Sequence, residues 1–248
     1  MDWNYVAEEL IANALGGILT ALVTALIGTI IAKKYLSQLN FNRQMQAIGI
    51  INTSTRMQTR REIARMCEKA ELIRLMNVSG VNYLKDNEKL LKSAMDRVAS
   101  VQLLCCAPDS VFLSDIEEME HNQKDPSGKP LRSEENHISD EIITAYERYA
   151  DEEKMEIRFY NTQYRMPYVL VYQNDDQIRA WLTVTLPPYK ARSKKSFVLR
   201  GEKSGTKTYN DEINFIDMIE TNFENIWEHG SVSAKEYMDR RQTAGGEK

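Results

Sequence analysis

Two short stretches of the chain combine cations with tyrosines in a way that suits a ligand carrying phosphate groups. The first stretch, YNTQYR, supplies Tyr160, Tyr164 and Arg165. The second, PPYKARSKKSFVLRGEK, concentrates positive charge and supplies Tyr189, Lys190, Arg192, Lys194, Lys195, Arg200 and Lys203. The candidate binding residues are Tyr164 and Arg165 of the first stretch and the residues from Tyr189 to Lys195 named in the second. Arginine and lysine bind phosphate, and a tyrosine ring can stack on a nucleobase. The two stretches therefore predict a site for a nucleotide or oligonucleotide, with a plain solvated basic loop as the alternative interpretation.

Residue patterns typical of catalysis are missing from the sequence. It contains no glycine-rich phosphate loop, no Ser-His-Asp set and no cluster with metal-ligand spacing. The three cysteines, Cys67, Cys105 and Cys106, are odd in number and lack zinc spacing, so we interpret them as buried thiols in a reducing compartment. The acidic runs at 117–120 and 151–153 fit solvated helix faces. We expect no catalytic residue, no metal and no cofactor.

The composition leaves room for one globular domain and an appendage, or for two small domains. The 248 residues are 42% hydrophobic and 27% charged. The net charge of −4 excludes a global basic field for nucleic acid, so a polyanion site must be a local patch.

Residues 10–32 carry no charge and form the most apolar stretch of the chain. A helix of this length covers about 34 Å, enough to cross a hydrocarbon core of about 30 Å. The preceding residues are acidic rather than basic, which disfavours a secretory signal; a buried core helix is the other alternative. Lys33, Lys34 and Arg43 follow the stretch. By the positive-inside rule we expect a single-pass inner-membrane protein whose C-terminal domain is cytoplasmic.

Small residues recur every fourth position in this stretch. One row consists of Ala12, Gly16, Thr20, Thr24, Gly28 and Ala32, and the adjacent row of Asn13, Gly17, Ala21, Ala25 and Thr29. Small residues allow close backbone approach between membrane helices, and threonine or asparagine can hydrogen-bond across them. We therefore predict a homo-oligomer, with Asn13, Thr20 and Thr24 lining a narrow pore. A simple anchor is the alternative.

The remaining chain alternates between apolar strands and amphipathic helices. We expect a helical stalk at 33–70, an α/β domain at 71–230 and a disordered tail at 231–248. Strands are expected at 71–80, 100–108, 155–161 and 196–202, with a hairpin at 168–186. Helices are expected at 82–99, 109–121, 135–153 and 210–230, the last capped by Asn210 and stopped by Gly230. The fold class is α/β, with its site near the carboxyl ends of the strands.

This order of elements resembles the phospholipase D-like fold. The resemblance rests on IRLMNVSGVNYL, AMDRVASVQLLCCAPDS, MEIRFYNTQYRMPYVLVYQNDDQIRAWLTVTLPP and the closing NIW, and it covers about 71–228. It implies a run of strand, helix, strand with a Pro-Asp loop, helix, strand and hairpin. It also implies a phosphate site beside that hairpin.

The catalytic signature of that family, His-x-Lys followed by Asp, is not found in this chain. The stretch where it is expected, RMPYVLVYQNDD, has no histidine. His121 stands in HNQK, which is one residue too long for the signature, while His137 and His229 lie at the ends of expected helices. We interpret all three as surface histidines and the domain as a catalytically degenerate form that binds without turnover.

Taken together, the layout resembles that of membrane effectors in bacterial antiviral defence. The hypothesis is an oligomeric pore or channel gated by a nucleotide or oligonucleotide at the cytoplasmic domain, with a partner enzyme that synthesises this signal. The expected partners are further copies of the chain, the bilayer and the nucleotide. The alternatives are a membrane-tethered phosphodiesterase or nuclease, and a membrane scaffold without pore activity.

Overall fold

The computed structural model describes the greater part of the chain beyond residue 41. The described residues are 29, 33, 39–40, 42–54, 56–79, 81–97, 99–124, 127–130, 132–133, 135, 137–149, 153–161, 166–174, 177–185, 196–204 and 214–245. The chain divides into two compact units, 1–46 and 47–248. In the first unit the described residues are helical. All the named strands and helices lie in the second unit.

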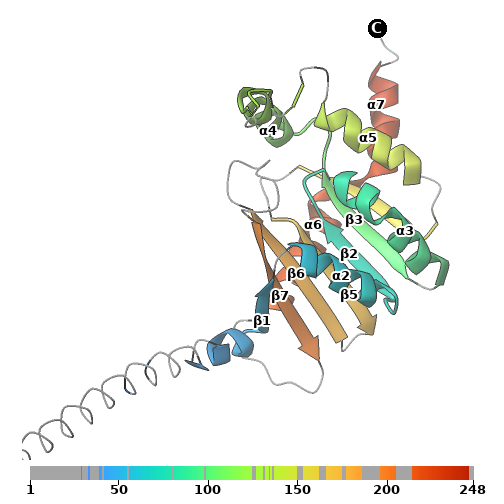
Figure 1. Cartoon of the computed structure of the whole chain (residues 1–248). Helices are drawn as coiled ribbons and strands as arrows, with labels where there is room; N and C mark the ends of the chain where they lie inside the picture. Colours follow the sequence, from blue (N-terminus) through green and yellow to red (C-terminus); the bar gives the residue numbers. More distant parts are fainter. Residues whose placement is uncertain are drawn as a thin grey trace, which may run out of the picture. The chain divides into compact units, whose positions relative to one another are not determined.

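An eight-stranded mixed sheet forms the centre of the second unit (Figure 1). In chain order its strands are β1 (Ile50–Ser54), β2 (Leu72–Met76), β3 (Ser100–Cys106), β4 (Met155–Tyr160), β5 (Tyr168–Asn174), β6 (Gln177–Thr185), β7 (Ser196–Ser204) and β8 (Ser231–Ser233). Across the sheet they follow the order β1-β7-β6-β5-β2-β3-β4-β8. Strands β2, β3 and β4 are mutually parallel, and every other pairing is antiparallel. The carboxyl ends of β2, β3 and β4 therefore meet at one edge of the sheet.

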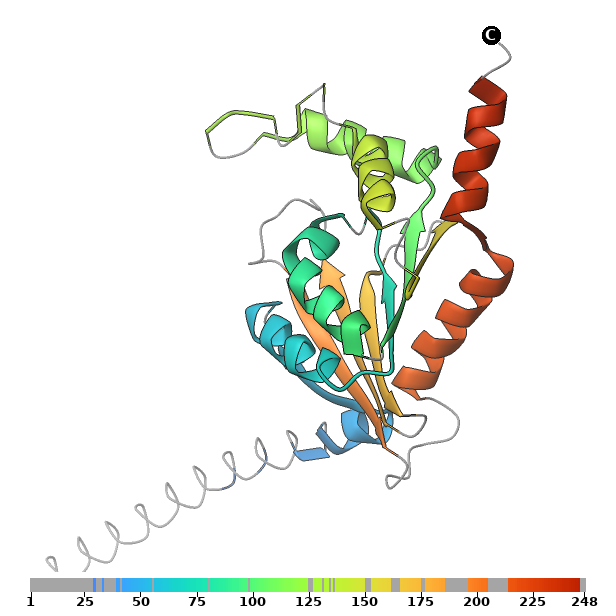
Figure 2. The ribbon, with the colours of Figure 1, turned by 90° about the vertical axis from the view of Figure 1, so that its right-hand side faces the viewer.

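Helices cover both faces of this sheet (Figures 1 and 2). They are α2 (Arg56–Cys67), α3 (Val81–Arg97), α4 (Val111–Asn122), α5 (Ile138–Tyr149), α6 (Phe215–His229) and α7 (Ala234–Gly245). Helices α2 and α3 lie on one face, α6 crosses the other, and α5 packs on α3 and α4. The result is a three-layer α/β arrangement in which the sheet is the shared core.

The central strands are apolar because they are covered on both faces. Ile73 and Leu75 of β2 point toward α2 and α3, and both are fully buried. Leu170 of β5 points toward α6 and is also fully buried. A strand covered on both faces is expected to be a nearly continuous apolar run, as LLCC in β3 and YVLVY in β5 are.

A polar cluster fastens α6 to its face of the sheet. The guanidinium of Arg74 in β2 donates to Gln102 of β3 at 2.9 Å, to the hydroxyl of Tyr172 at 2.9 Å and to Glu224 of α6 at 3.0 Å. The Tyr172 hydroxyl in turn donates to Glu220 of α6 at 2.9 Å. Three acceptors hydrogen-bond to the partly buried guanidinium of Arg74. The cluster therefore sets the position of α6 without leaving the buried charge unpaired.

A second polar cluster holds α2 on the opposite face of the sheet. Glu62 of α2 pairs with Arg200 of β7 at 2.7 Å and accepts a hydrogen bond from the indole of Trp181 in β6 at 3.4 Å. Trp181 is among the largest fully buried side chains among the described residues. Its ring supplies apolar contact, and its N–H needs a partner once it is buried.

The start of the second unit differs from the helical stalk expected at 33–70. Residues 50–54 form edge strand β1, paired with β7, and α2 packs on the sheet. Gly49 allows the turn into β1 because its φ is +81°. The carbonyls of Ile48 and Gly49 accept hydrogen bonds from Phe215 and Glu202, at 2.8 and 3.2 Å. The apolar and β-branched residues in this segment therefore complete the sheet rather than lengthen a helix.

The end of the chain also differs from the disordered tail expected at 231–248. Residues 231–233 form β8 on the edge of β4, and α7 follows as a helix. The ring of Tyr237 anchors α7 to the sheet, because it packs edge-on against the ring of Phe159 in β4, with 5.2 Å between the ring centroids.

The helix α6 begins at Asn214 rather than near Asn210, because the Asn214 side chain accepts hydrogen bonds from the amides of Ile216 and Asp217. Gly230 ends this helix as expected.

The predicted membrane-spanning fold class and inner-membrane location require correction. Within the part of the chain that the structure describes, no helix is long and apolar enough to cross a bilayer. The longest of the named helices, α3, carries charges from Lys85 to Arg97, and its buried apolar residues form a single face. The fold class is a mixed α/β domain with an eight-stranded sheet. The membrane-spanning and ion-channel interpretations therefore find no support in the described residues.

The small-residue rows behind the oligomer prediction lie mostly outside the described residues. The predicted pore-lining or helix-packing positions are Asn13, Gly16, Gly17, Thr20, Ala21, Thr24 and Gly28, and none is described; of residues 10–32 only Thr29 is. Self-association of the chain therefore stays a prediction.

The close packing of Gly201 provides a test of the sheet–α6 interface. A Cβ at this position of β7 would lie 2.4 Å from the ring of Phe215 and 2.9 Å from Ile216. We expect Gly201→Ala to lower the free energy of unfolding in urea by about 1–3 kcal/mol, the usual cost of overpacking. A Phe215→Leu change should recover part of that loss in the double variant. Equal stability of Gly201→Ala and the parent protein would contradict this packing.

Candidate functional site

Strand ends from across the sheet meet at one edge, which we call the carboxyl edge. It is formed by the carboxyl ends of β1, β2, β3, β4 and β6 and the amino ends of β5, β7 and β8. The register defines this edge, since Met76 at the end of β2 pairs with Tyr168 at the start of β5. In turn Tyr168 pairs with Leu182, and Thr185 pairs with Ser196.

The two stretches that carry tyrosines and cations are each flanked by one strand that ends at this edge and one that begins at it. The first stretch lies between β4, which ends at Tyr160, and β5, which begins at Tyr168. The second lies between β6, which ends at Thr185, and β7, which begins at Ser196. The candidate binding residues themselves lie outside the described residues: Tyr164, Arg165, Tyr189, Lys190, Arg192, Lys194 and Lys195. The strands on either side of them reach the same edge.

Asn77, directly after β2, presents a polar group at this edge that the sequence analysis did not single out. Its side-chain amide nitrogen is buried and has no hydrogen-bond partner among the described residues. Its backbone is paired, since the amide donates to Leu104 at 3.0 Å and the carbonyl accepts from the hydroxyl of Tyr160 at 3.3 Å. A buried amide N–H without a partner is a costly group that a ligand oxygen could satisfy.

Asp109, in the Pro-Asp turn after β3, is the second polar group. It accepts a hydrogen bond from the hydroxyl of Tyr237, which α7 brings to the edge. Burial, followed by this hydrogen bond to the carboxylate, raises the pKa of Tyr237 to about 12. Ser110, the buried residue before α4, begins that helix without a capping hydrogen bond from its side chain.

Exposed apolar side chains accompany these polar groups. Val111, the first residue of α4, is 75% exposed, and Met166, just before β5, is 48% exposed. They are two of the four large apolar side chains that are exposed in the described part of the chain. Both side chains leave apolar surface accessible near the polar groups of this edge, where a ligand with an apolar face could contact it.

The three histidines do not assemble a catalytic group. His121 of α4 lies 3.1 Å from the carbonyl of Ser133, and His137 lies 3.4 Å from the carboxylate of Glu117. His229 ends α6, and β8 after it pairs with the end of β4, so it lies at the carboxyl edge. It is exposed, and it is followed by Gly230 and Ser231 rather than by the His-x-Lys pattern.

The cysteines do not supply a nucleophile either. Cys67, Cys105 and Cys106 are all buried and free of disulfides, as the sequence analysis predicted. Burial raises the pKa of Cys67 to about 12 and that of Cys106 to about 11, and it also raises that of Cys105. Thiolates are therefore rare at neutral pH. Among the described residues, no group of three His, Cys, Asp or Glu side chains has a metal-binding arrangement.

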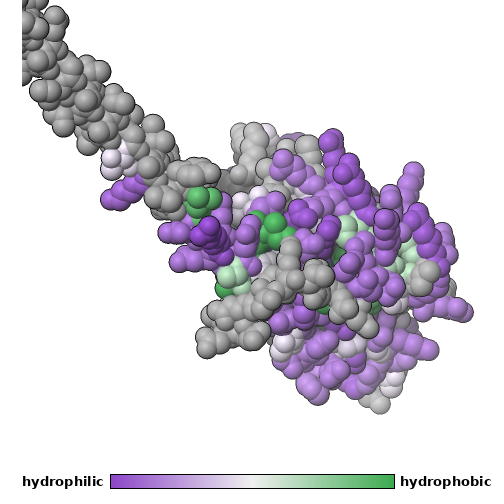
Figure 3. Space-filling view, turned by 90° about the horizontal axis from the view of Figure 1, so that it is seen from below, coloured by the Kyte–Doolittle hydropathy of each residue, from purple (hydrophilic) through white to green (hydrophobic). Residues whose placement is uncertain are grey.

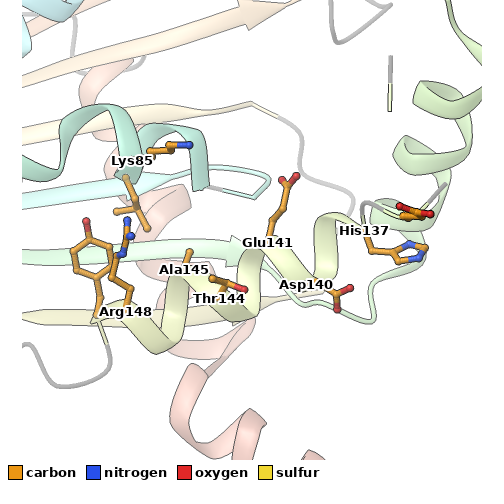
Figure 4. Close-up of a pocket in the computed structure, with 10 residues that line it drawn as sticks. Lys85, His137, Asp140, Glu141, Thr144, Ala145 and Arg148 are labelled. Carbon is orange, nitrogen blue, oxygen red and sulfur yellow. The ribbon is translucent and has the colours of Figure 1, made fainter. Parts of the chain in front are cut away.

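A cavity of about 350 Å³ lies between α3 and α5 (Figure 4). Leu84 and Lys85 of α3 line one side, and Thr144, Ala145 and Arg148 of α5 line the other. The lining is completed by Glu135, His137, Asp140, Glu141 and Tyr149. We call this cavity the α3–α5 groove.

Ion pairs hold the helices around the groove. Arg132 pairs with Glu120 of α4 at 2.8 Å and with Glu141 of α5 at 3.0 Å. These hydrogen bonds oppose the effect of burial and keep the pKa of Arg132 above its ordinary value. Glu117 of α4 accepts a hydrogen bond from the amide of Ile138, at the first turn of α5. The acidic helix α4 thus fixes where α5 begins.

Comparisons with known proteins add little to this site. No protein-family model matches the chain, and no curated protein matches it. Among solved structures, TrmBL2, an archaeal chromatin protein reported to show a novel mode of DNA binding, is similar over 88% of this chain and 69% of its own. The identity is 13% and the TM-score is 0.42, which is too low to support an argument about fold or function.

The buried thiols lead to a prediction about reactivity. At pH 8 a thiol whose pKa is about 11 has roughly one molecule in a thousand as thiolate, so native protein should react with DTNB very slowly. We expect all three thiols to react within minutes in urea, and native reactivity to rise as the pH rises toward 11. A native thiol that reacts within minutes at pH 8 would contradict the burial of this cluster.

Proposed function

We propose that the second unit of this chain binds a nucleotide or oligonucleotide at the carboxyl edge without hydrolysing it. The observation that carries the proposal is the common edge reached by the strands that flank both cation-rich stretches. Sites of α/β proteins are found beyond the carboxyl ends of parallel strands, so the strand ends that flank these stretches lie beside the usual position of a ligand.

The described residues at the edge suit the two parts of such a ligand. The amide nitrogen of Asn77 can donate to a phosphate oxygen, and the exposed side chains of Val111 and Met166 can contact the apolar face of a base. Tyr164 and Tyr189 would stack on bases, and the five predicted cations, Arg165, Lys190, Arg192, Lys194 and Lys195, would neutralise phosphates. Each type of group has a counterpart in the ligand.

A phospholipase D-like ancestry for the domain is part of this proposal. It is supported by the succession of β2, α3, β3, α4, α5, β4 and the hairpin of β5 and β6, in the positions expected from the sequence. The hairpin that carries the phosphate-binding signature in that family begins here at the carboxyl edge, with Tyr168 and Leu170 as its first α6-facing residues. Neither side chain is the histidine that acts as the nucleophile in that family, and the hydroxyl of Tyr168 donates a hydrogen bond to Asn222 of α6 at 3.1 Å.

Charge reversal of the second stretch tests the proposal. We expect the variant with Lys190, Arg192, Lys194 and Lys195 all changed to Glu to lose at least a hundredfold in affinity for a labelled hexa-adenylate, measured by fluorescence anisotropy. Parent protein with four phosphate contacts should show a slope of about −3 for log K against log salt, and the variant should lose that slope. The labelled oligonucleotide should be recovered intact.

A matched control separates this stretch from general charge. Four exposed cations on or beside α2 and α3 are available: Arg65, Lys69, Lys89 and Lys92. Changing these four to Glu alters the net charge equally, and we expect affinity within about threefold of the parent at 0.15 M salt. Equal losses in the two variants, or undiminished binding in the first, would refute a site at the carboxyl edge.

A further inference from the structure

The α3–α5 groove has an ordered distribution of charge along its length. Asp140 and Glu141 belong to the first turn of α5, and Arg148 belongs to its last turn. Figure 4 shows Lys85 of α3 above the end of the groove where Arg148 lies, with Glu141 and Asp140 toward the other end. One end is therefore acidic and the other is basic.

Apolar side chains lie between the charged ends. Leu84, Ala145 and Tyr149 line the groove, and Leu84 and Tyr149 are almost completely buried beneath it. A surface of this kind contacts an apolar group by dispersion and excludes water from it. The groove thus offers an acidic end, an apolar floor and a basic end in that order.

The basic end keeps donors available for a ligand. Arg148 is 58% exposed in its side chain, and its ion pair with Glu88 is long, at 3.7 Å. A guanidinium has five N–H donors, so this pair leaves most of them for another acceptor. Lys85 is exposed on the facing helix.

The acidic end is equally open. Glu141 is already paired with Arg132, and His137 lies beside Glu117. Glu135 and Asp140 are exposed carboxylates that line the same end. A cation there would face more negative than positive charge.

We propose that the α3–α5 groove binds a short zwitterionic peptide of about three residues, with its ammonium at the Asp140 end and its carboxylate at the Arg148 end. Residues eight apart in a helix are about 12 Å apart along its axis. Three extended residues span at most about 10–11 Å, and the long side chains of Arg148 and Lys85 close the remainder. A free amino acid is too short to reach both ends.

This site is separate from the proposed nucleotide site and does not rest on it. The groove binds charges of both signs, whereas an oligonucleotide carries only negative backbone charge and would be repelled by Glu135, Asp140 and Glu141. A protein that binds peptide here and nucleotide at the carboxyl edge would respond to two chemically distinct ligands.

Isothermal titration of the full chain with the tripeptide Ala-Leu-Ala tests the proposal. We expect a dissociation constant of about 1 mM or tighter. N-acetylated and C-amidated forms should each bind at least fivefold more weakly, because each lacks one terminal charge. Ala-Asp-Ala should also bind more weakly, because its central side chain meets Leu84 and Tyr149.

Two neutralising variants test the orientation. Arg148→Gln should reduce the effect of C-amidation of the tripeptide, leaving only the contribution of Lys85, and the pair Glu135→Gln and Asp140→Asn should reduce the effect of N-acetylation, leaving only that of Glu141. These side chains are exposed, so the thermal midpoint should stay close to that of the parent protein. Lys89→Gln, on α3 but outside the groove lining, is the matched control and should bind Ala-Leu-Ala like the parent.

Three results would overturn the proposal. The first is no heat of binding with Ala-Leu-Ala up to 10 mM in a folded protein. The second is equal affinity for alanine and for the tripeptide, which would mean that the two ends of the groove do not act together. The third is a neutralising variant whose sensitivity to both blocking groups matches that of the parent.

Discussion

The antiparallel pairing of β2 with β5 is the constraint on which the rest of the structure depends. β2 lies between a parallel neighbour, β3, and an antiparallel neighbour, β5. Because the direction changes at this pair, the start of β5, the end of β6 and the start of β7 lie at the edge where β2, β3 and β4 end. With a parallel β5, the start of β5 would lie at the opposite end of the sheet from the end of β4. The mixed sheet thus brings to one edge the strand ends that flank both sequence stretches.

On each face of the sheet, a helix is held by apolar packing and by a small cluster of hydrogen bonds and ion pairs. On one face Arg74 joins β2, β3, β5 and α6, and on the other Glu62 joins α2 to β6 and β7. Burial supplies most of the stabilisation, because apolar area removed from water is the main favourable contribution to folding. The polar contacts decide where each helix lies. Seen from below in Figure 3, the described surface is mainly polar, with apolar residues in small groups.

Local pattern predicted most of the elements well, and pairing explains the exceptions. The spacing of apolar residues and the turn residues between them predicted the helices α3 and α6 and the strands β2 to β7. Each of these elements has an apolar face that is buried, and that face is visible in its own sequence. The segment around Ile50 was interpreted as a stalk, and residues 231–233 as a tail. Both are short edge strands, whose apolar pattern is weak and whose partner lies far away in sequence. At the site, Asn77 carries no recognisable motif and its only signal was its position just after an apolar strand, whereas Asp109 belongs to the Pro-Asp loop implied by the resemblance but was not assigned a role.

By itself, the sequence determined the α/β class, the approximate order of elements, the burial of the three thiols and the absence of a His-x-Lys signature, since all of these are properties of composition or local period. It did not determine which strands are neighbours, which way β5 runs or where the groove between α3 and α5 opens. Those depend on residues far apart in the chain, such as Met76 and Tyr168, which pair across the sheet, and Lys85 and Arg148, which line one cavity from different helices. Only the tertiary structure decided them, because the free energy of such contacts is realised only when the whole sheet and its covering helices are assembled.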